Sequence, residues 1–262
     1  MSYFDAQVLD RHAYLDSPVH RLDPRAKVLA TFAFVIAVVS HDKYALAPLA
    51  PFVLYPLLLA VIGFVPASLL ARRLLAASPF VLVIGIFNPL FDRAPLLALG
   101  PWTLSGGWVS FFSIALRGYL CVAAAIALIA TTSIPRIAEA LRALGVPRVM
   151  VVQLLLLYRY LFLLAGEAGR MNRARALKAG GRRATLGVAG SMLSVLMMRT
   201  LDRAEAVWLA MKARGFEGEL LTARRMEWRP ADSIFLAAVV AGCAAMRIYP
   251  VAELLGRWLG AA

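Results

Sequence analysis

Long apolar runs dominate this sequence, and the most persuasive of them is an alanine-rich run over residues 108–132. About 20 apolar residues are enough for a helix to cross the hydrocarbon core of a bilayer. Hydrophobic residues make up 61% of the 262-residue chain and charged residues 16%, whereas soluble domains average about 45–50% and about 25%. We therefore predict an all-α, polytopic helical membrane protein.

Five apolar runs are candidates for membrane-spanning helices. They are residues 28–40, 44–65, 78–91, 108–132 and 232–248. The first run is short, so we expect its helix to extend into the preceding turn or to tilt. Residues 66–77, which include Arg72 and Arg73, predict an amphipathic turn at the cytoplasmic surface.

The pattern divides the chain into four segments. Residues 1–27 form a cytoplasmic arm, 28–132 about four transmembrane helices, 133–229 a cytoplasmic region, and 230–262 the last transmembrane helix with a tail. The third segment predicts one short helix, 134–144, and two long ones, from 148 to about 179 and from about 184 to 213. Glycines follow each of these helices and are typical helix stops.

The distribution of charge predicts the orientation. The net charge is +13, and residues 166–229 alone contain 13 basic and 6 acidic residues. Cytoplasmic segments of membrane proteins are enriched in Lys and Arg. The basic segments alternate with neutral ones along the chain, which is what a cytoplasmic N-terminus requires. This explanation removes the need for a nucleic-acid partner.

Motifs for catalysis and metal binding are missing from the sequence. It contains no G-x-x-x-x-G-K-[ST], C-x-x-C or H-E-x-x-H pattern. His12, Asp16 and His20 are spaced like ligands on one helix face, but Pro18 interrupts that helix, so we expect no metal site and no cofactor. The first three spans lack ionisable residues, which argues against a membrane enzyme and against a self-contained permease, the alternative function.

Two basic patches, each at the end of a long predicted helix, are the most informative feature. The first extends from Met171 to Gly180 and the second from Ala210 to Phe216. Small neighbours would let such a helix end enter a narrow groove, where a basic side chain can reach a carboxylate or a carbonyl. The alternative is a positive-inside anchor followed by a glycine stop.

Three sequence motifs resemble the T component of energy-coupling factor (ECF) transporters, which are ABC-type micronutrient importers. Residues 17–27 (SPVHRLDPRAK) are similar to that family's H-x-L-D-P-R-x-K motif. Pro135 and 145–147 (GVP), followed by 157–160 (LYRY), are similar to its central region. Ala213, Arg214 and Gly215 match its second Ala-Arg-Gly signature.

The resemblance implies a non-enzymatic scaffold in the bacterial inner membrane. Two cytoplasmic coupling helices would cross, dock into two ABC ATPase subunits, and hold a substrate-binding membrane subunit. The N-terminal motif is most similar to the cobalt/nickel subgroup, CbiQ, which implies cobalt supply for cobalamin biosynthesis. The first signature departs from the pattern, so two triplets remain candidates for the first ATPase-docking site: Ala174-Arg175-Ala176 and Leu177-Lys178-Ala179.

Overall fold

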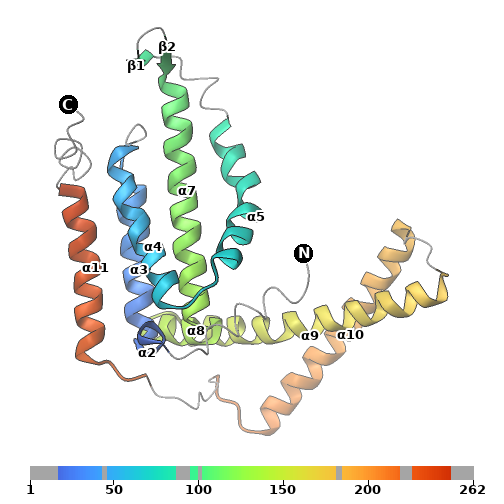
Figure 1. Cartoon of the computed structure of the whole chain (residues 1–262). Coiled ribbons are helices and arrows are strands. Elements are labelled where there is room, and N and C mark those ends of the chain that lie inside the picture. Colours follow the sequence, from blue (N-terminus) through green and yellow to red (C-terminus); the bar gives the residue numbers. More distant parts are fainter. Residues whose placement is uncertain are drawn as a thin grey trace. The chain divides into compact units, whose positions relative to one another are not determined.

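The structure is a computed structural model that describes residues 17–42, 46–86, 95–99, 102–180, 185–218 and 226–248. The chain forms two compact units (Figure 1). The spanning unit comprises residues 9–137 and 226–262, and the long-helix unit comprises residues 1–8 and 138–225. Each unit is described below by itself.

Helices build the spanning unit, and a short hairpin joins two of them. The antiparallel strands β1 (Pro95–Leu99) and β2 (Trp102–Ser105) lie between α5 and α7. The helices are α2 (Pro18–Arg21), α3 (Pro24–Val39), η1 (Ala47–Val53), α4 (Leu54–Ile62), α5 (Ala67–Ile86), α7 (Gly106–Thr131) and α11 (Pro230–Ile248). The prediction of an all-α membrane protein is confirmed.

The long-helix unit contains most of α8 (Ile134–Ala143), α9 (Arg148–Lys178) and α10 (Leu186–Ala213). Among the described residues, four helices are long and apolar enough to cross a membrane: α5, α7, α9 and α11. The bounds of α8, α9 and α10 agree with the sequence prediction to within two residues.

The core of the spanning unit lies where α3, η1, α7 and α11 meet. Phe34 is fully buried and stacks on Tyr55 with ring centroids 4.5 Å apart. The buried cluster is Phe34, Val38, Leu49, Phe52, Leu120, Ala124 and Cys243. Along α7, buried alanines such as Ala124 and Ala127 allow neighbouring helices to approach closely, which is how membrane helices gain packing energy.

Two expectations for the first three spans have different outcomes. Helix α3 begins at Pro24, so the first span does extend into the preceding turn. The predicted turn at residues 66–77 is wrong, because α5 continues through Arg72 and Arg73 to Ile86. Arg72 is exposed and Arg73 is half-buried, and long basic side chains can keep their charge in water while the helix continues.

Helix α5 also contains Pro79, which cannot donate a backbone hydrogen bond to the carbonyl of Leu75. The Ser78 hydroxyl donates to that carbonyl instead, over 2.8 Å. A neighbouring hydroxyl is one of the ways in which membrane helices accommodate proline. The helix therefore continues where the sequence predicted a new segment.

Candidate functional site: the crossing of two long helices

Helices α9 and α10 cross and contact each other within the long-helix unit (Figure 1). Glu167 of α9 lies at the contact and accepts hydrogen bonds from Arg170 of its own helix and from Arg199 of α10. Leu163, Leu164 and Leu196 surround this ion pair. The arginine from the second helix therefore ties the two helices together at one point along their length.

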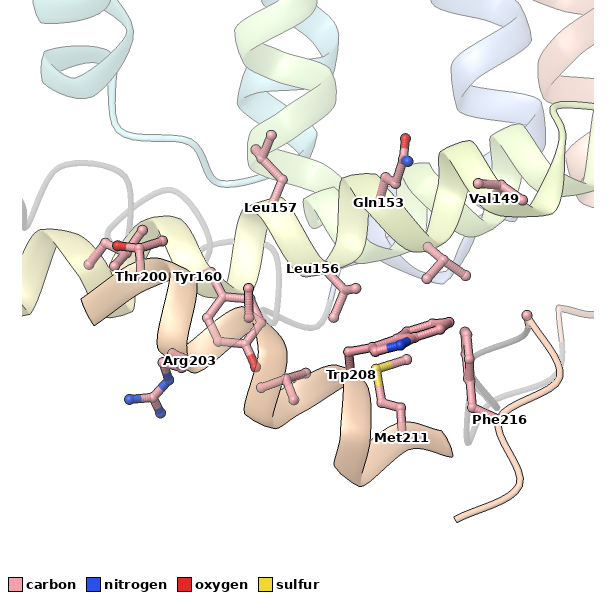
Figure 2. A pocket seen from close by; sticks show the side chains of 15 residues that line it. Val149, Gln153, Leu156, Leu157, Tyr160, Thr200, Arg203, Trp208, Met211 and Phe216 are labelled. Carbon is pink, nitrogen blue, oxygen red and sulfur yellow. The ribbon is translucent and has the colours of Figure 1, made fainter. Parts of the chain in front are cut away.

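An apolar groove of about 450 Å³ lies where the first half of α9 faces the second half of α10. Its volume is in the range of ligand pockets, about 300–1,000 Å³. Figure 2 shows Trp208, Met211 and Phe216 gathered on one side, facing Leu156 of α9. The few polar side chains of the lining are Gln153, Tyr160, Thr200 and Arg203. Trp208 is 54% exposed although it is large and apolar, which is typical of an interaction surface.

The second basic patch ends α10 in a well-defined turn. Gly215 has φ +72°, a left-handed conformation that glycine adopts most easily. Its N–H donates to the carbonyl of Lys212 and the N–H of Phe216 to that of Met211, each over 3.0 Å. These two hydrogen bonds form the Schellman pattern, and the side chains of Met211 and Phe216 line the same groove. Arg214 is the C-cap residue.

The two basic side chains next to this turn differ in their surroundings. The Lys212 ammonium lies 5.9 Å from the centre of the Trp208 ring, within cation–π range. Arg214 is exposed, as are Ala213 and Gly215. In the described part of the chain, no hydrogen bond or ion pair engages the Arg214 guanidinium. The turn therefore presents Arg214 outward.

The first basic patch ends α9 in a similar way. Lys178 is the last helical residue and is exposed, and Gly180 has φ +56°. Arg175 is half-buried, and its Nε donates to Oδ1 of Asn172 over 3.3 Å. Ala174 and Ala176 are exposed. Both candidate cations thus lie in the last turns of α9.

The structure keeps the two patches apart. Phe216, the last residue of the second patch, lines the same groove as Val149 at the start of α9. Lys178 lies at the other end of α9, and a helix rises 1.5 Å per residue, so the two patches are separated by roughly 40 Å along α9. The two basic patches are therefore well separated.

Sequence reasoning missed the Glu167–Arg199 pair because the partners are 32 residues apart and lie on different helices. The one sequence feature that could have indicated this pair is Glu167, an acidic residue at the boundary between the apolar and basic halves of α9. Of the three residues considered as metal ligands, His12 and Asp16 lie outside the described residues. The His20 imidazole forms a 2.7 Å hydrogen bond with the Ser17 hydroxyl.

The fold and this site define a class: a multi-pass helical membrane protein with two crossing helices that end in separate basic patches. Comparison with known families identifies which family within this class the chain belongs to. Residues 16–226 match the family described as cobalt transport protein, CbiQ. The chain belongs to this family, which confirms the resemblance to the T component of ECF transporters.

Individual relatives agree with this assignment. The energy-coupling factor transporter transmembrane protein EcfT of Limosilactobacillus fermentum is 31% identical over 86% of this chain and 91% of its own length. The cobalt transport protein CbiQ of Rhodobacter capsulatus is 34% identical over 39% of this chain and 42% of its own length. An uncharacterized protein of Methanocaldococcus jannaschii is 30% identical over 50% of this chain and 46% of its own length. The chain thus spans less than half of the last two relatives and nearly all of EcfT.

Proposed function

We propose that this protein is the non-enzymatic scaffold of an ECF-type importer. It couples ATP hydrolysis by two partner ABC ATPase subunits to movement of a substrate-binding membrane subunit, and the cargo is cobalt. Residues 133–229 form the cytoplasmic coupling region, between the N-terminal arm with four transmembrane helices and the last transmembrane helix. The family description and the two separate basic helix ends support this proposal.

The observation that carries the proposal is that the two crossing helices, α9 and α10, each end in a basic patch and that these two ends lie far apart. Each end combines an exposed basic side chain, a left-handed glycine and small neighbours. An arginine can bind a carboxylate through two parallel hydrogen bonds. Two such ends roughly 40 Å apart along α9 suit two ATPase subunits better than one. A positive-inside anchor would need the charge but not the defined turns.

The apolar groove suggests how the second partner is held. Trp208 and Leu157 of the α9–α10 groove are exposed, and the half-buried Met211 lines it beside a few polar groups. Aromatic and methionine side chains are enriched in protein interfaces, and methionine repacks easily when a partner moves. We assign this groove to the substrate-binding membrane subunit. The scaffold itself has no P-loop, so the ATPase activity belongs to the partners.

Co-purification and transport test the proposal. Arg214→Glu should lose ATPase subunits and cobalt uptake while the scaffold still folds, because no helix–helix contact changes. Removing one partner from a buried charge pair costs about 3–5 kcal/mol, and charge reversal adds repulsion. Arg159→Glu is the matched control for ATPase co-purification, since Arg159 is exposed and lies on α9 well before Lys178, the last residue of that helix.

Two results would count against the scaffold. Unchanged uptake in Arg214→Glu would remove Arg214 from the docking site. Cobalt uptake by liposomes that contain only this chain would favour a self-contained permease instead.

A further inference from the structure

A buried polar cluster lies in the spanning unit, where the ends of α3, α7 and α11 meet. Lys27 and Asp232 are each 1% exposed and Asp23 is 4% exposed. Charged side chains are seldom buried unless their polar atoms are satisfied. Burying two carboxylates and one ammonium at one junction therefore calls for a specific role.

The ammonium of the cluster holds the end of α7. Lys27 Nζ donates to the carbonyl of Thr131 over 2.9 Å. Thr131 is the last residue of α7, so its carbonyl has no partner within the helix. Lys27 belongs to the first turn of α3. The bond therefore joins the beginning of one spanning helix to the end of another.

The carboxylates hold the beginning of α11. Oδ1 of Asp232 accepts the N–H of Asp23, and Oδ2 accepts the N–H of Arg229, each over 2.7 Å. Asp23 in turn caps α3 by accepting the N–H of Arg25 over 2.8 Å. One side chain of α11 thus fixes both its own first turn and the entry to α3.

These contacts lie on the two connections between the units. The chain leaves the spanning unit within α8, after Ile137 and six residues beyond Thr131, and it returns at residue 226, just before Arg229 and Asp232. Lys27 holds the outgoing connection, and Asp23 holds the returning one. Both residues belong to the entry of α3, four positions apart. A purely stabilising cluster could lie anywhere in the unit, whereas this one lies at both connections.

We propose that Asp23, Lys27 and Asp232 form a clasp that positions both connections of the long-helix unit. Through the clasp, movement of α9 and α10 reaches α7 and α11 together rather than being absorbed by two loose linkers. The inference rests on the proposed function, because it assumes that the long-helix unit transmits movement. It assigns a positioning role to the D-P-R-x-K part of the N-terminal motif.

The test compares coupling with stability in the complete complex in liposomes. Asp232→Asn keeps the side-chain size but can accept only one of the two N–H groups. Lys27→Met keeps the apolar stem and loses the donor. Both variants should assemble with the ATPases and hydrolyse ATP, while cobalt transported per ATP falls by roughly 10- to 100-fold, the scale of one lost hydrogen bond to a charged group.

Arg247→Met is the matched control. Arg247 also joins α11 to α3, by donating to the carbonyl of Ser40 over 2.9 Å, but it does so at the other end of α11. Because Arg247 is exposed, this variant should lower the melting temperature less than Asp232→Asn does, and it should leave the transport-to-ATP ratio unchanged. Hydrogen exchange should increase at residues 226–232 in Asp232→Asn and at residues 131–137 in Lys27→Met, and at neither segment in Arg247→Met.

The outcomes separate the two proposals. If the unmodified chain fails to bind ATPases, the proposed function is wrong. If it binds and transports, but Asp232→Asn keeps the normal ratio or Arg247→Met lowers the ratio equally, the cluster is only stabilising and the clasp is wrong.

Discussion

Gly215 allows the docking geometry to be tested with a single added methyl group. Its φ of +72° lies in the left-handed region, and an added Cβ would find no atom within 4 Å. Gly215→Ala therefore creates no clash, and its effect comes from the backbone alone. A left-handed conformation costs an L-residue about 1–2 kcal/mol. If docking needs this turn, the competent population falls by roughly 5- to 30-fold.

Two further variants isolate the backbone effect. Gly190→Ala, inside α10, also adds a methyl group with no atom within 4 Å and has no positive φ. It should stabilise the helix by about 0.5–1 kcal/mol. Gly215→Asn should recover part of the lost affinity, because asparagine adopts the left-handed conformation more readily than alanine.

The assay is a titration of detergent-solubilised scaffold with the ATPase subunits, accompanied by thermal unfolding. We expect weaker binding for Gly215→Ala, intermediate binding for Gly215→Asn, and wild-type binding for Gly190→Ala. Equal affinities for Gly215→Ala and the unmodified chain would refute the reasoning, because Arg214 would then dock without this turn.

Two other substitutions test the packing of each unit. Phe34→Ala removes a fully buried ring that stacks on Tyr55, and it should destabilise the spanning unit by about 3–5 kcal/mol, which thermal unfolding in detergent would detect; a loss below about 1 kcal/mol would contradict this packing. Arg199→Met removes the bond from α10 to Glu167, so limited proteolysis between α9 and α10 should become faster. The difference from the unmodified chain should be largest at low salt, because ionic strength screens exposed ion pairs.

Local sequence signals predicted the long-helix unit well. Glycines with positive φ follow α9 and α10 at Gly180 and Gly215, and the change from apolar to basic residues along each helix was enough to identify both patches. These signals depend on a few neighbouring residues, so they can be recognised in a single sequence.

Contacts between residues that are far apart in the sequence could not be predicted. The break predicted at residues 66–77 was inferred from Arg72 and Arg73, yet helix α5 continues through both, with Arg72 exposed and Arg73 half-buried. The partners of Lys27 and Asp232 are a backbone carbonyl 104 residues away and a backbone N–H 209 residues away. A backbone carbonyl or N–H is the same group whatever the residue type, so the sequence does not indicate which residue supplies it. Only the fold reveals these contacts.

The cation that docks from α9 can now be predicted from its place in the helix. Arg214 is exposed and directly precedes its left-handed glycine. Lys178 is likewise exposed and lies two residues before Gly180, whereas Arg175 is half-buried, lies one turn earlier and hydrogen-bonds to Asn172. We therefore expect Lys178, rather than Arg175, to reach the first ATPase subunit.

Single and double neutralisations test this expectation. Lys178→Gln or Arg214→Gln alone should weaken ATPase binding only in part, because the remaining end keeps its own affinity and loses only the avidity of the pair. Both should uncouple ATP hydrolysis from transport, since both helices must move.

The Lys178→Gln/Arg214→Gln double variant should abolish the complex, and the Arg175→Gln/Arg214→Gln control should resemble Arg214→Gln. The reverse result would assign docking to Arg175. If neither α9 variant changes binding while Arg214→Gln alone abolishes it, the paired arrangement is wrong, and the basic end of α9 is a membrane-surface anchor.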